Sequence, residues 1–288
     1  MKNDVFSLKR FSRYFVTDLR AAISNYGISL LVLASMILTI DLFSGALSSL
    51  TSGSWSGIGL GGRSTLMFIF FLIAIISAPS KIYGHITGRK EGTAFLMLPA
   101  STLEKFISMV LICAAVVPLA YFVLTAAVDI LTCLIDPTCG VSVVSEFSIF
   151  RDKLLTALQS DQEVPLSLTA AIDGLSSPLL YADDIASLAL AFLLGAILFK
   201  KSKIAKTIGC MILISMAVSM IFTPIIMLST FGQMIKDPTV IMSENLADTL
   251  PFLGWIFKHP VLVDTVSDTI WNVALLFLIW LRLKKMKH

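Results

Sequence analysis

Residues 28–47 read ISLLVLASMILTIDLFSGAL, and Asp41 is the single charged side chain in this stretch. An α-helix of this length spans the hydrocarbon core of a bilayer, which is about 30 Å thick. Apolar residues follow one another throughout the stretch, without the period-two alternation that a membrane β-strand shows. The stretch therefore predicts a transmembrane α-helix.

Further apolar runs along the chain have the same character. The chain of 288 residues is 56% hydrophobic and only 14% charged, whereas a soluble domain has about 25% charged residues. This composition excludes a soluble globular domain and a disordered chain. We predict an all-α integral membrane protein, a single transmembrane domain of residues 1–288 with six transmembrane helices. The predicted spans are 28–47, 64–82, 106–131, 183–200, 207–231 and 265–281.

Basic residues are distributed unevenly among the segments that connect these runs. Cytoplasmic segments of membrane proteins carry the excess of Lys and Arg. By this rule both termini and the connection 83–105 are cytoplasmic, and segments 132–182 and 232–264 are external. The net charge of +3 provides no basic footprint for nucleic acid, so we expect no such partner. Of the 22 Lys and Arg residues, those on the external side are Arg63, Arg151, Lys153, Lys236 and Lys258.

The segment 5–24, before the first span, has the pattern of an amphipathic helix. Its apolar residues recur at steps of three or four, and its basic residues fall on the opposite face. We predict an interfacial helix that lies in the cytoplasmic headgroup plane and contacts membrane lipid. A basic topology signal with no further role is the alternative. The apolar positions are Val5, Leu8, Phe11, Phe15, Leu19 and Ala22, and the basic ones are Lys9, Arg13 and Arg20.

Ionisable and sulfur-containing side chains near the outer ends of the spans are the next candidates. Asp41 and Asp129 either line an outward-facing vestibule of a transport pathway or are hydrated carboxylates at the interface. Cys133 and Cys139 either form a disulfide in an oxidising exterior or remain free thiols. The Gly/Ser-rich turn 51–63 is expected to be a flexible external loop.

The sequence contains no pattern that predicts catalysis. The motifs GxSxG, HExxH and the phosphate-binding P-loop are absent, and the three His are scattered along the chain. We therefore expect no catalytic residues, no metal site and no cofactor bound by this chain.

The cytoplasmic connection contains HITGRKEGTAFLMLPASTLEKF, residues 85–106. Gly92 can end the preceding segment, and Pro99 stops the apolar piece that follows it. Ser101 and Glu104 then have the spacing of a helix-capping box. The pattern predicts a short element across the cytoplasmic ends of the spans, followed by a new helix that continues into the third span.

In this topological setting the connection resembles that of the membrane subunits of type-2 ABC exporters. In that family a charged run is followed by Gly-Thr, an apolar stretch ending in Leu-Pro, a small residue and Ser, and a Glu five residues after the Pro. This chain has Glu91-Gly92-Thr93, Leu98-Pro99-Ala100-Ser101 and Glu104 in those places.

The resemblance implies a permease subunit of an ATP-driven exporter in a bacterial cytoplasmic (inner) membrane. The connection would be the coupling helix that docks on a separate ABC-type ATPase, which binds ATP and Mg²⁺, and a second permease copy would complete the path. Alternatives are a non-transporting membrane scaffold or regulatory partner, and an ion-coupled secondary carrier. We expect Glu91 and Glu104 to pair with basic groups on the ATPase. The implied coupling residues are Arg89, Lys90, Glu91, Gly92, Thr93, Leu98, Pro99, Ala100, Ser101, Glu104 and Lys105.

Overall fold

A computed structural model describes most of the chain, and every regular element in the described residues is a helix. Four helices are long and apolar enough to cross a membrane, which agrees with the predicted class of a multi-pass, all-α membrane protein. The described residues are 6–88, 95, 97–98, 100–136, 138–140, 142–143, 145, 178–236 and 260–285. The four helices are Leu8–Ser52, Leu60–Ile82, Thr102–Ile135 and Lys203–Met220.

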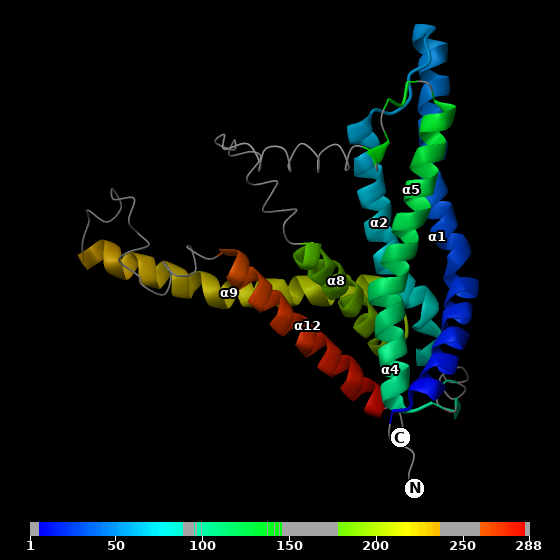
Figure 1. Cartoon of the computed structure of the whole chain (residues 1–288). Coiled ribbons are helices and arrows are strands. Elements are labelled where there is room, and N and C mark those ends of the chain that lie inside the picture. Colours follow the sequence, from blue (N-terminus) through cyan, green and yellow to red (C-terminus); the bar gives the residue numbers. More distant parts are fainter. Residues whose placement is uncertain are drawn as a thin grey trace, which may run out of the picture.

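The first helix, α1 (Leu8–Ser52), contains both the predicted interfacial helix and the first predicted span (Figure 1). The predicted bend into the headgroup plane is absent from residues 8–24, because these residues continue into the first predicted span as one helix. A lone glycine, Gly27, is too weak a break to interrupt the helix, at a cost of about 1 kcal/mol. A helix of 45 residues is about 68 Å long, more than twice the thickness of a hydrocarbon core. Its first third therefore extends beyond the predicted span.

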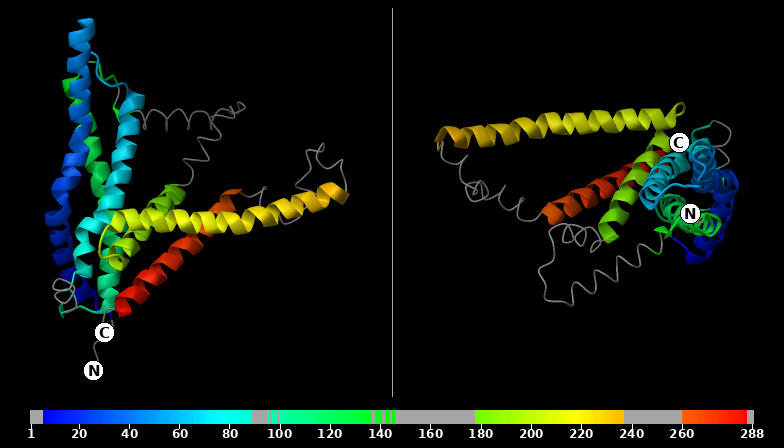
Figure 2. Two further views of the ribbon diagram at one scale, coloured as in Figure 1. Left: turned by 180° about the vertical axis from the view of Figure 1, so that it is seen from behind. Right: turned by 90° about the horizontal axis from the view of Figure 1, so that it is seen from above.

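Two further long helices run beside α1 and form an upright bundle with it (Figures 1 and 2). One is α2 (Leu60–Ile82), which is followed by the short 3₁₀ helix η1 (Gly84–Thr87). The other begins as α4 (Thr102–Leu111), passes through the π-helical turn η2 (Ile112–Val116) and continues as α5 (Val117–Ile135). Pro118 is the second residue of α5, two positions after the π turn. Because proline cannot donate a backbone N–H, an irregular hydrogen-bond ladder at this point is expected.

Three more helices make a second group beside this bundle. They are α8 (Pro178–Leu198), α9 (Lys203–Lys236) and α12 (Pro260–Lys285). Helices α8 and α12 pack on each other, and α9 runs away from the upright bundle at a steep angle (Figure 2). Helices thus cover the six predicted spans except for residues 199–200, because α8 ends at Leu198. The side chains of residues 212–220 of α9 are exposed, so within this single chain α9 has an uncovered apolar surface.

The core lies where α1, α2, α5, α8 and α12 meet. Small side chains such as Ala74 and Ala78 of α2 are almost completely buried and let the helix backbones approach closely. Tyr26 of α1 donates its hydroxyl to the Ala74 carbonyl oxygen at 2.9 Å and so satisfies a polar group inside the apolar core. The start of α1 and the end of α12 both lie beside α4, at one end of the bundle (Figure 1).

Candidate functional site

The side chain of Glu104, in the first turn of α4, is completely buried and joins α4 to α1. Its carboxylate accepts hydrogen bonds from Arg10 Nε at 2.9 Å and from Arg10 Nη2 at 2.8 Å. It also accepts from the backbone N–H of Ser7 at 3.0 Å. These charge-assisted bonds fasten the beginning of α1 to the beginning of α4. We call the four residues Ser7, Arg10, Ser101 and Glu104 the corner clamp.

The capping box predicted for α4 is confirmed. Ser101 Oγ accepts from the Glu104 N–H at 3.2 Å, and the Glu104 carboxylate accepts from the Ser101 N–H at 2.9 Å. Glu104 precedes the predicted span 106–131. The hydrogen bonds from Arg10, its largest perturbation, lower the pKa of Glu104 from its ordinary value to about 2. Glu104 is therefore an anion at any physiological pH.

Lys105 fastens the segment before α4 in a similar way. Its side chain is only 5% exposed. Its ammonium donates to the Phe95 carbonyl oxygen at 2.8 Å and lies 5.0 Å from the centroid of the Phe95 ring. The expectation that Glu104 is available to basic groups of a partner is therefore wrong, and Lys105 is not an exposed docking charge either. Both charges are already bonded within this chain.

Apolar side chains, and not charges, project from the described part of this connection. Met97 is 84% exposed and Leu98 is 42% exposed, whereas Phe95 is buried in the hydrophobic core. Ala100 and Ser101 are half-buried. The other predicted coupling residues lie outside the described residues; they are Arg89, Lys90, Glu91, Gly92, Thr93 and Pro99.

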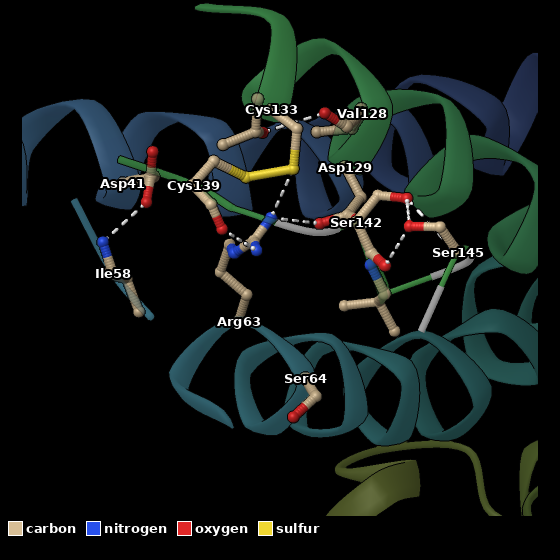
Figure 3. Close-up of polar contacts among 12 residues, drawn as sticks. Asp41, Ile58, Arg63, Ser64, Val128, Asp129, Cys133, Cys139, Ser142 and Ser145 are labelled. Atoms are coloured by element: carbon tan, nitrogen blue, oxygen red, sulfur yellow. Dashed lines mark hydrogen bonds and ion pairs between the residues drawn. A yellow bond between two sulfur atoms is a disulfide. The ribbon is translucent and has the colours of Figure 1, made fainter. Parts of the chain in front are cut away.

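The opposite end of the bundle contains an ion pair between α2 and α5. The side chains of Arg63 and Asp129 are both completely buried, and Arg63 Nη1 lies 2.9 Å from Asp129 Oδ1 (Figure 3). Arg63 also donates from Nη2 to the Cys139 carbonyl oxygen at 3.0 Å. Asp129 Oδ2 accepts from the Val143 N–H at 2.6 Å. The ion pair thus connects α2 with α5 and both helices with the segment that follows α5.

Two more carboxylates organise the turn between α1 and α2. Asp41 accepts from the Ile58 N–H at 2.8 Å, and Asp136 accepts from Trp55 Nε1 at 2.9 Å. Gly57 lies against both carboxylates, so that a side chain at this position would collide with Asp136. The turn 51–63, expected to be a flexible loop, is therefore held by specific side-chain bonds.

Asp41 and Asp129 do not line an outward-facing vestibule, contrary to the expectation from the sequence. Asp41 is 1% exposed and Asp129 is 0% exposed. The alternative of hydrated interfacial carboxylates is excluded by the same burial. Each instead accepts a backbone N–H from a connecting segment, so both are structural fastenings of this end of the bundle. Among the described residues, no group of three His, Cys, Asp or Glu is placed to hold a metal ion.

The structure joins Cys133 and Cys139 by a disulfide, which closes a short loop at the end of α5 (Figure 3). Arg63 Nη1 lies 3.0 Å from Cys133 Sγ, and the Cys139 carbonyl accepts from the same guanidinium. The bridge therefore fixes the loop that covers the buried ion pair. Cys113 and Cys210 are free thiols.

We predict that replacing Cys133 with serine lowers the free energy of unfolding by about 2 kcal/mol, because the unfolded chain regains the freedom of the opened loop. The double variant Cys133→Ser/Cys139→Ser should be no less stable than the single variant. The comparison is made by thermal unfolding of the purified protein, with Cys210→Ser as the control. A double variant that loses twice as much as the single one would show that the cysteines act independently.

Arg63 is the residue that sequence reasoning missed. It was counted as one of the external basic residues, although it stands at the beginning of an apolar run, where a charged side chain is costly without a partner. Asp129 lies near the outer end of the next run, which is antiparallel to the first if both cross the membrane. The sequence signal for the ion pair was therefore the position of these two opposite charges near the outer ends of neighbouring spans.

Comparison of the chain with known protein families, with curated proteins and with solved structures gives no match.

Proposed function

We propose that this chain is the permease subunit of an ATP-driven exporter, in which a separate ATPase binds ATP and Mg²⁺. The observation that supports this proposal best is the corner clamp. Ser7 and Arg10 of the N-terminal region are bonded to Glu104 at the start of α4, directly after a segment from which Met97 and Leu98 project. The resemblance of residues 88–105 to the coupling loop of type-2 ABC exporters supports the same conclusion.

The corner clamp is suited to transmit a displacement. Charge-assisted hydrogen bonds to a buried carboxylate are short and resist separation, because Glu104 left alone would keep an unsatisfied buried charge. A partner that pushes on the segment 95–101 would therefore move α4 and the first turns of α1 together. The π turn η2 lies between this corner and α5, and Pro118 lies in the first turn of α5. They form a natural place for α4 to tilt relative to α5.

In this proposal the protein has six spans in a bacterial inner membrane, with both termini and the corner clamp in the cytoplasm. The distribution of Lys and Arg supports this orientation. The disulfide lies at the opposite end of the bundle, which would face the oxidising exterior. A second copy of the permease would cover the apolar surface that α9 exposes in the single chain.

Replacing both Met97 and Leu98 with glutamate is predicted to abolish association with the ATPase. Two carboxylates would have to be desolvated in an interface that the wild-type side chains fill with apolar surface. The test is affinity purification of the full chain in mild detergent from its native cells, followed by mass spectrometry. We expect a P-loop ATPase in stoichiometric amount with the wild-type protein and at least a ten-fold loss with the double variant.

The matched control is Met97→Leu, which keeps an apolar side chain of similar volume and should retain the ATPase. Absence of any ATPase from the wild-type preparation would contradict the proposal and favour a scaffold or regulatory role. Transport that continues without ATP and stops when an ion gradient is collapsed would favour a secondary carrier.

A further inference from the structure

A cavity of about 840 Å³ lies beside the corner clamp, between the first turns of α1, the turn after α2 and the segment before α4. This volume is in the range of sites that bind small molecules. Aromatic side chains form much of its wall, among them Tyr14 of α1, Tyr83 after α2 and Phe95 before α4. The cavity therefore offers apolar surface at the end of the bundle where α1 begins.

Basic side chains from one face of α1 surround this apolar wall. Lys9 and Arg13 line the cavity and are exposed. Neither forms an ion pair with a carboxylate within the described part of the chain. Arg10 also lines the cavity, but its guanidinium is bonded to Glu104. The uncompensated charge of the site therefore comes from Lys9 and Arg13, one turn of helix apart.

The carboxylate that lines the cavity already has hydrogen-bond partners within the chain. Asp18 is the one carboxylate among the described lining residues, and it accepts hydrogen bonds from Tyr83 Oη at 2.9 Å and from Ser108 Oγ at 2.5 Å. Asp18 lies in the first third of α1, before the predicted span. Asp18 forms no ion pair with Lys9 or Arg13 within the described residues, so two cationic side chains stand against one carboxyl group at this cavity.

We propose that this cavity binds the headgroup of an anionic glycerophospholipid. The phosphate would lie against Arg13 and Lys9, since a guanidinium matches the geometry of phosphate oxygens and an ammonium adds a point charge. The glycerol and the first part of the acyl chains would lie against Tyr14 and Phe95. The cytoplasmic leaflet carries the anionic lipids that basic juxtamembrane segments attract. This inference rests on the orientation given under Proposed function but not on the ATPase partner.

Lipid binding to the purified, delipidated full-length protein tests the proposal, with native mass spectrometry as the readout. The probes are phosphatidylglycerol and phosphatidylcholine with identical acyl chains. We expect preferential binding of phosphatidylglycerol and a loss of about five-fold in its affinity for each of Arg13→Ala and Lys9→Ala. The matched control is Arg20→Ala, because Arg20 is an exposed cation of α1 that does not line the cavity. It should bind phosphatidylglycerol as the wild type does.

Several results would overturn the proposal. One is equal binding of the two lipids. Another is a loss of affinity for phosphatidylglycerol in Arg20→Ala as large as in Arg13→Ala, which would indicate diffuse electrostatic attraction along α1. Full displacement of phosphatidylglycerol by inorganic phosphate at equal concentration would assign the cavity to a free anion. Unchanged lipid binding by Arg13→Ala together with loss of the copurified ATPase would assign it to the protein partner. Thermal unfolding of the variants should match the wild type, since both side chains are exposed.

Discussion

Replacing Arg63 with leucine is expected to lower the free energy of unfolding by about 3–5 kcal/mol, because Asp129 is left as a buried charge without its partner. Both side chains are completely buried, and the ion pair joins α2 to α5 at 2.9 Å. The substitution also removes the hydrogen bond that the Cys139 carbonyl oxygen accepts from Arg63 Nη2. The measurement is equilibrium unfolding of the purified protein in detergent, followed by circular dichroism.

The double variant Arg63→Leu/Asp129→Leu is the informative control. Removing both charges eliminates the stranded carboxylate, so the double variant should recover a large part of the stability that the single variant loses. Losses that simply add would contradict a direct pair. If Arg63→Leu is as stable as the wild type, Asp129 is hydrated at this end of the bundle and the ion pair is not buried.

Replacing Glu104 with alanine is expected to destabilise the protein by about 2–3 kcal/mol, because it removes the partner of Arg10 together with the acceptor for the Ser101 N–H. The loss should be smaller than for Arg63, since the Arg10 side chain is 33% exposed and can be hydrated when it is left alone. A double-mutant cycle with Arg10→Ala should give a coupling free energy above about 1 kcal/mol. Strictly additive losses would contradict the corner clamp.

The same residue predicts a pH dependence. The pKa of Glu104 is lowered to about 2 in the folded protein from an ordinary value of 4.5. The stabilisation from this carboxylate is therefore fully present above about pH 4.5 and is lost as the pH falls towards 2. Glu104→Gln removes the ionisable group, so the variant does not lose this stabilisation on acidification. The difference in free energy of unfolding between the wild type and Glu104→Gln should therefore become smaller as the pH falls from 5 to about 3. An unchanged difference over that range would contradict the assignment.

Much of the fold follows from the sequence because it depends on local properties. Long apolar runs predict helices, and helices cover the six predicted spans except for residues 199–200. The capping box at Ser101 and Glu104 was predictable for the same reason, since it depends only on spacing within one turn. The continuity of α1 was not predicted, because an amphipathic pattern shows which face of a helix is apolar but does not show where the helix bends.

The candidate site was harder to predict because its contacts join residues far apart in the chain. The spacing of Ser101 and Glu104 predicts a capping box, but the bond between Glu104 and Arg10 bridges 94 positions. The Arg63–Asp129 pair bridges 66 positions. A charge near the end of an apolar run is compatible with a hydrated side chain and with a buried pair, and only the packing of the helices decides between them. The steep direction of α9 is a property of the tertiary arrangement, which hydropathy does not specify.

The proposals for the ATPase partner, the lipid site and the oxidised disulfide all depend on which end of the bundle faces the cytoplasm. Cysteine accessibility in sealed, right-side-out vesicles tests this orientation most directly. Single cysteines are introduced at Met97, beside the corner clamp, and at Ser54, beside the opposite end, in a background where Cys113 and Cys210 are serine. We expect a membrane-impermeant maleimide to label position 54 in intact vesicles and position 97 only after permeabilisation. Labelling of both positions in intact vesicles, or of position 97 alone, would contradict the orientation.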